Sequence, residues 1–124
     1  ARHAALEMDT TTFRVLGHRL VDQLADSLAS IPHGPVTPGE APSAVRAALA
    51  SSGSLPEAGT EPGPLLEQTA RLLFDHSLFN GHPRFMGYIT AAPAPIGMLG
   101  ELLAAAVNPN VGAWTLSPAA TAAA

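Results

Sequence analysis

The sequence predicts a mainly α-helical fold for this chain of 124 residues. Apolar residues between positions 12 and 31 recur at steps of three and four, as they do along one face of an α-helix. Two later stretches, one that begins at Pro64 and one that covers residues 95–107, are also expected to be helical. Prolines and glycines, which end helices, flank both of them. Only residues 85–89 have the composition of a short extended segment.

The first helix is expected over residues 12–31. Asp9 or one of the threonines at positions 10–12 can accept a hydrogen bond from a free backbone N–H at its start. Pro32 ends it, because proline has no N–H to donate and disfavours helix in the residue before it. The apolar face of this helix consists of Phe13, Leu16, Leu20, Val21, Leu24, Leu28 and Ile31.

Prolines and glycines dominate residues 32–64, which we interpret as a linker with one short helix at about residues 43–50, ended by Ser51-Ser52-Gly53. A linker of this length is unusual inside a compact domain. We therefore expect residues 32–64 to lie across another surface, as an arm does.

Pro64 is expected to begin a second helix at its first position, with Leu65, Leu66, Thr69, Leu72, Leu73 and Phe74 packed and Asn80-Gly81 at its end. Residues 95–107 are expected to form a buried, alanine-rich helix. Ser117-Pro118 is a start signal for a further helix that stops soon after Thr121. We interpret the chain as a piece of a longer protein.

The charge content supports that interpretation. Charged residues make up 13% of the chain, against about 25% in typical soluble domains. So few charges indicate that further chain or a partner covers much of the surface. The net charge is −4 and the arginines are scattered, so no nucleic-acid partner is expected. The absence of cysteine excludes disulfides and thiolate zinc sites within the chain.

Neither a membrane segment nor a metal site is predicted. The most apolar stretch, residues 88–107, is interrupted by prolines, glycines and Glu101. The first residues lack the apolar core of a signal peptide, so a cytoplasmic location is expected. His76 and His82 are six residues apart, which does not place two ligands on one helical face.

Three motifs stand in order between residues 82 and 121: His82-Pro83-Arg84-Phe85, Gly87-Tyr88-Ile89-Thr90, and residues 108–114 (NPNVGAW) followed by Ser117-Pro118. Each is a weak signal alone. Their order and spacing resemble the N-terminal part of the pyridoxal-phosphate-dependent group II amino-acid decarboxylases, which include the aromatic-L-amino-acid and glutamate decarboxylases.

The resemblance implies a division into two parts. Residues 1–80 would form a helical arm, with the linker at 32–64, that swaps across a homodimer. Residues 81–124 would begin the α/β large domain of the fold-type-I pyridoxal-phosphate enzymes. The activity implied is decarboxylation of an L-amino acid, with an aromatic amino acid as the first choice of substrate.

The resemblance also implies which residues contact the substrate. Tyr88, Ile89, Thr90 and Ala91 match a segment that lines the substrate pocket. Asn110, Val111 and Gly112 match a loop that reaches the pocket from the neighbouring subunit. Read as residues alone, Tyr88 and Thr90 are equally explained as strand residues that pack a core, and Asn-Pro-Asn as a simple turn.

No catalytic or cofactor-binding residue is predicted within the chain. The implied cofactor, pyridoxal 5′-phosphate, is held on a lysine, and this sequence contains no lysine. Its long basic side chains are all arginines: Arg2, Arg14, Arg19, Arg46, Arg71 and Arg84. The cofactor is therefore expected to bind elsewhere in the complete protein. The alternative is a stand-alone, non-catalytic helical interaction module.

Overall fold

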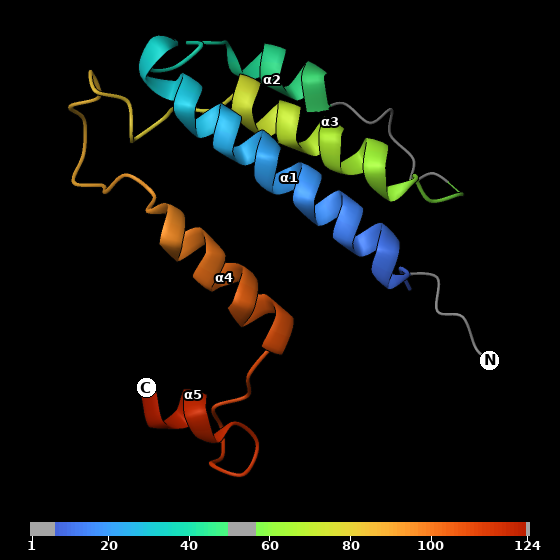
Figure 1. Cartoon of the computed structure of the whole chain (residues 1–124). Helices are drawn as coiled ribbons and strands as arrows, with labels where there is room; N and C mark the ends of the chain where they lie inside the picture. Colours follow the sequence, from blue (N-terminus) through green and yellow to red (C-terminus); the bar gives the residue numbers. More distant parts are fainter. Residues whose placement is uncertain (1–6, 50–56, 124) are drawn as a thin grey trace. The chain divides into compact units, whose positions relative to one another are not determined.

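A computed structural model describes residues 7–49 and 57–123. The helices in order are α1 (Thr10–Ser30), the 3₁₀ helix η1 (Ile31–His33), α2 (Pro42–Leu49), α3 (Pro62–Asp75), α4 (Pro95–Val107) and α5 (Pro118–Ala123), as Figure 1 shows. The described residues contain no strand. The mainly α prediction is confirmed for this part of the chain, whereas the start of an α/β domain is not seen in it.

The chain divides into two compact units, Ala1–Thr90 and Ala91–Ala124. The first contains α1, η1, α2 and α3, and the second contains α4 and α5. Each unit is described by itself below.

α1 begins where Asp9 places a carboxylate beside the free N–H groups of the first turn. Asp9 Oδ1 accepts hydrogen bonds from the backbone N–H groups of Thr11 and Thr12, both at 2.9 Å. The predicted cap is therefore Asp9, and the helix starts two residues earlier than expected. At the other end Pro32 lies in the 3₁₀ turn η1, so α1 ends at Ser30 as its proline predicts.

α3 differs from its prediction at both ends. It begins at Pro62, because Pro62 and Pro64 both occupy the first turn, where no N–H has an intrahelical partner. It ends at Asp75 rather than at Asn80-Gly81. Here tertiary contacts decide, because His76 bonds Glu40 and the Phe79 N–H bonds the carbonyl of Val36 at 3.1 Å.

α1 and α3 lie side by side and run parallel (Figure 1). Two contacts show that the helices run in the same direction. Gly63 lies beside Leu16, where a Cβ built on the glycine would be 3.5 Å from Leu16 Cδ2, and Glu67, further along α3, pairs with Arg19, further along α1. The 3.5 Å distance is an ordinary van der Waals contact, so Gly63 lies against the Leu16 side chain of the other helix. The C-terminal ends of both helices are consequently neighbours.

Burial departs from the predicted apolar faces. On α1, Leu16, Leu20, Leu24 and Leu28 are half-buried, but Phe13 and Val21 are exposed. On α3, Leu72 and Phe74 are half-buried, whereas Leu65, Leu66, Thr69 and Leu73 are exposed. The buried apolar residue is Ala70, 6% exposed, which the sequence pattern did not single out.

The predicted linker contains more order than expected. η1 follows α1 directly, and α2 occupies Pro42–Leu49, close to the predicted residues 43–50. The predicted end of this helix at Ser51-Ser52-Gly53 lies outside the described residues. Residues 62–64 belong to α3, so the linker is shorter than predicted.

In the second unit, α4 has the predicted bounds and ends at Asn108, whose φ of 46° and ψ of 55° form a left-handed cap. The prediction that this helix is buried is wrong for the described chain: no residue of α4 is buried. A unit of so few residues cannot enclose a helix that is apolar on all sides. α5 begins at Pro118, as predicted, and runs to Ala123.

Candidate functional site

The polar contacts of the first unit concentrate where the ends of α1 and α3 meet. The backbone after α1, at Gly34 and Val36, lies against the backbone after α3, at Phe79 and His82. We call these residues, with Arg84, the junction. The parallel course of α1 and α3 creates it, because it brings the two helix exits together.

His82 is the centre of the junction and is only 3% exposed. Its Nε2 lies 3.0 Å from the carbonyl oxygen of Gly34, and its Nδ1 accepts the backbone N–H of Arg84 at 3.0 Å. Since Nδ1 accepts, the ring proton is assigned to Nε2, which donates to Gly34. Both nitrogens of this neutral imidazole are thus occupied by backbone groups.

Further contacts hold residues 79–85, the segment that contains His82. The Phe79 ring stacks on Phe74, with centroids 6.0 Å apart and planes 20° apart. The His82 N–H donates to the carbonyl of Phe79 at 3.0 Å, and the Phe85 N–H donates to the carbonyl of His82 at 2.9 Å. Residues 79–85 are therefore a compact turn fixed to the exit of α1.

A second histidine joins the linker to α3. His76 Nδ1 lies 2.6 Å from Glu40 Oε2, and both side chains are largely covered. No sequence pattern indicated this pair or the partners of His82. Residues 36 or more positions apart in sequence give no local signal of such contacts.

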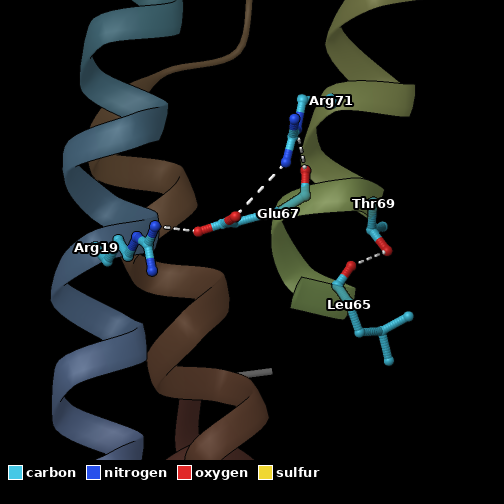
Figure 2. A network of polar contacts seen from close by, with 5 residues as sticks. All are labelled: Arg19, Leu65, Glu67, Thr69 and Arg71. Atoms are coloured by element: carbon cyan, nitrogen blue, oxygen red, sulfur yellow. Dashed lines mark hydrogen bonds and ion pairs between the residues drawn. The ribbon is translucent and has the colours of Figure 1, made fainter. Parts of the chain in front are cut away.

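Glu67 links the two long helices by charge (Figure 2). Its carboxylate pairs with Arg19 of α1 and, at 3.5 Å, with Arg71 one turn further along α3. Both arginines are well exposed, so this network contributes at most about 1 kcal/mol.

An open hollow of about 350 Å³ lies beside the junction. Hydrocarbon surface makes up most of its wall, and no cluster of convergent polar groups lies within it. It is lined by Ser27, Ser30, Ile31, Gly34, Pro35, Pro38, Phe74, Asp75 and Phe79.

The first predicted pocket segment follows the junction directly. Tyr88 and Ile89 form a bend and are 90% and 105% exposed, and Thr90 is exposed as well. The prediction of an extended segment over residues 85–89 is wrong, because Tyr88 has a φ of 57° and the described part of the chain has no strand to pair with it. The alternative that Tyr88 and Thr90 pack a core as strand residues is also contradicted.

The second predicted pocket segment is the loop between α4 and α5. Asn110 Oδ1 accepts the backbone N–H of Gly112 at 2.9 Å, which closes an Asx turn, and Val111 at its tip is exposed. The turn expected from Asn-Pro-Asn is therefore present. A Cβ at position 112 would lie only 3.0 Å from Asn110 Oδ1, so this compact turn favours glycine there.

The predicted site residues belong to different units. Tyr88, Ile89 and Thr90 end the first, and Ala91 together with residues 110–112 belongs to the second. Within each unit the segment is exposed, and none of its residues lines the hollow beside the junction.

The residues present do not fit pyridoxal phosphate. A Schiff base needs a lysine amine, and the sequence has none. Among the described arginines, Arg19 and Arg71 are engaged by Glu67, and Arg84 Nη2 points to the Gly34 carbonyl at 3.5 Å. The part of the chain that the structure covers contains no group of three or more His, Cys, Asp or Glu residues that could hold a metal ion. No described helix is both long and apolar enough to span a membrane.

Comparison with known proteins decides the family. The chain is 35% identical to a tyrosine decarboxylase of Oryza sativa subsp. japonica over 122 residues, which cover 98% of this chain and 23% of that protein. It is 31% identical to a phenylacetaldehyde synthase of Petunia hybrida, over 92% of this chain and 22% of that protein. It is 27% identical to an aromatic-L-amino-acid decarboxylase of Bacillus atrophaeus, over 88% and 22% respectively. The chain belongs to the amino-acid decarboxylase family.

The chain spans less than a quarter of the length of the decarboxylase relatives it matches. No family model matches it, and no solved structure matches it. The match extends over nearly the whole chain, so the helices of the first unit belong to the family's sequence as well as the motifs after His82.

Proposed function

We propose that this chain is the N-terminal part of a pyridoxal-phosphate-dependent decarboxylase of aromatic L-amino acids. The observation that carries the proposal is the 35% identity over 98% of the chain to a tyrosine decarboxylase. Two further relatives have names that also refer to aromatic compounds. Membership of an enzyme family over the whole chain disfavours the stand-alone interaction module.

This part of the protein would supply contacts to the substrate and contacts between the two subunits of a homodimer. Tyr88, Ile89, Thr90 and Ala91 would line the substrate pocket, and Asn110, Val111 and Gly112 would reach the pocket of the neighbouring subunit. Their high exposure in the separate units supports this, because side chains that form a pocket with other parts of a protein are uncovered when those parts are absent.

Residues 1–80 would form the homodimer arm. The exposed apolar side chains on the described helices of this stretch, including Phe13, Val21 and Leu73, support an interface. The cofactor would bind to the rest of the complete protein, because no lysine is present here. The complete protein is expected to act in the cytoplasm.

The experiment is to purify the complete protein with pyridoxal phosphate and supply L-tyrosine, L-tryptophan, L-phenylalanine and L-glutamate separately. We expect carbon dioxide and the matching amine from at least one aromatic substrate, and at least tenfold lower kcat/KM with glutamate. Amine and aldehyde are both measured, since one relative is a phenylacetaldehyde synthase. An aldehyde as the main product, or glutamate as the best substrate, would contradict the proposal.

A further inference from the structure

The last residue of the junction, Arg84, stands four positions before Tyr88, where the predicted pocket segment begins. Phe79, His82 and Arg84 contact the exit of α1, and from Met86 onward the large side chains are uncovered: Met86 is 93% exposed and Tyr88 90%. The direction in which residues 86–90 continue is therefore set by the last fixed turn. His82 is the buried side chain of that turn.

Two kinds of contact meet in the His82 ring. Its Nδ1 accepts the N–H of Arg84, which is local and shapes the turn itself. Its Nε2 donates to the carbonyl of Gly34, 48 residues earlier, which attaches the turn to the exit of α1. This long-range bond relates the pocket segment to the arm, together with the bond from the Phe79 N–H to the Val36 carbonyl and the 3.5 Å contact of Arg84 Nη2 with the Gly34 carbonyl.

A short mechanical path connects this turn to Tyr88. The Phe85 N–H bonds the His82 carbonyl, and the Phe85 ring lies over Gly87, where an added Cβ would be 3.3 Å from Phe85 Cε2. Gly87 directly precedes Tyr88, which has a left-handed backbone and is 90% exposed. A displacement of the turn at His82 would thus move Tyr88.

We propose that His82 is a positioning residue, which holds the pocket segment in place through the bond from its Nε2–H to the Gly34 carbonyl. Two substitutions of His82 can separate the contact made by Nδ1 from the contact made by Nε2. A glutamine amide can reach the place of Nε2 and donate to Gly34, whereas a shorter asparagine can take the place of Nδ1 and accept from Arg84. His82→Gln therefore retains the long-range bond, and His82→Asn loses it.

The test uses the complete protein and two measurements. In amide hydrogen exchange, we expect His82→Asn to raise the exchange rates of residues 85–90 about five-fold or more, and His82→Gln to stay within two-fold of the wild type. In kinetics, which rest on the proposed function, we expect His82→Asn to raise KM for the aromatic substrate about five-fold with kcat and bound cofactor little changed.

His76→Gln is the matched control. His76 at the end of α3 bonds a distant residue, Glu40, through Nδ1, which glutamine does not reproduce, and it lies outside the turn that leads into the pocket segment. We expect this substitution to leave KM and the exchange of residues 85–90 unchanged. Equal effects of His76→Gln and His82→Asn, or exchange in His82→Gln as fast as in His82→Asn, would overturn the positioning role. If the wild type decarboxylates no aromatic amino acid, the proposed function fails, while the exchange measurement still decides on His82.

Discussion

Tyr88 has a backbone conformation that few residues of its type adopt. Its φ of 57° lies in the left-handed region, which costs a residue with a Cβ roughly 1–2 kcal/mol. Such strain persists only where the surroundings enforce it, and it is concentrated at functional sites. The compact turn from Phe79 to Phe85 ends three positions before this residue, which is itself 90% exposed. This outlier therefore adds a physical reason to consider Tyr88 a substrate contact.

The first prediction tests the ring of Tyr88. In the complete protein, Tyr88→Ala should lower kcat/KM for the aromatic substrate ten-fold or more, about 1.4 kcal/mol, without releasing the cofactor. Alanine retains the Cβ and hence the backbone strain, so the change isolates the ring. Tyr88→Phe is the control and should cost much less if ring area matters more than the hydroxyl. Unchanged steady-state kinetics in the alanine variant would place Tyr88 outside the pocket.

Among the elements, the pair α1 and α3 organises the first unit. They meet at Gly63 and Leu16, and α3 carries the buried residue Ala70. The exposed network of Glu67 adds direction more than stability. The start of α1 depends on Asp9, whose side-chain bond to the Thr12 hydroxyl, followed by its bonds to backbone N–H groups, lowers the pKa of the carboxyl below 3.8.

The second prediction concerns this cap and its pH dependence. A carboxyl with a lowered pKa in the folded state stabilises that state above the unfolded value of 3.8, and the contribution is lost as pH falls through the folded pKa. We expect Asp9→Ala to increase amide exchange of the first turn of α1 at pH 6 in the complete protein. At pH 3 the difference between variant and wild type should shrink.

Asp9→Asn is the control for that experiment, because asparagine caps a helix equally well without titrating. It should protect the first turn at pH 6 nearly as Asp9 does, and its protection relative to Asp9 should improve at pH 3. If Asp9→Ala and the wild type exchange alike at pH 6, the cap does not stabilise α1.

Across the whole molecule, the described residues do not enclose a core. The buried residues are Ala70 and His82, while many large apolar side chains on α1, α3 and α4 are exposed. Low charge and uncovered apolar surface agree with the proposal that the remainder of a decarboxylase and a second subunit cover these helices.

The third prediction addresses that interface through Phe13, which is 62% exposed on α1. Phe13→Asp should weaken the dimer of the complete protein at least ten-fold, about 1.4 kcal/mol or more, since it places a charge in an apolar contact. Sedimentation over a dilution series measures this. His18→Asp adds the same negative charge about 140° around the helix and should leave the dimer intact. A Phe13→Asp dimer as tight as the wild type would show that this face of α1 is not the interface.

Local chemistry was enough to predict the helices of this chain and most of their limits. Asp9, Pro32, Pro95 and Pro118 act through their own or adjacent backbone groups, so the start of α1, its end, and the starts of α4 and α5 could be read from short stretches of sequence. The ordered motifs from His82 to Pro118 also indicated the family that the comparisons show.

Contacts between distant residues decided the rest. α3 stops at Asp75 because Glu40 and Val36 hold the residues that follow it, and His82 is buried because Gly34 lies opposite its ring. Tyr88 leaves the extended conformation just beyond the turn that His82 anchors, where the described residues offer no strand for pairing. A local pattern records the preference of a backbone for helix or strand, but not which distant carbonyl will meet a given side chain, because that depends on the parallel packing of α1 and α3.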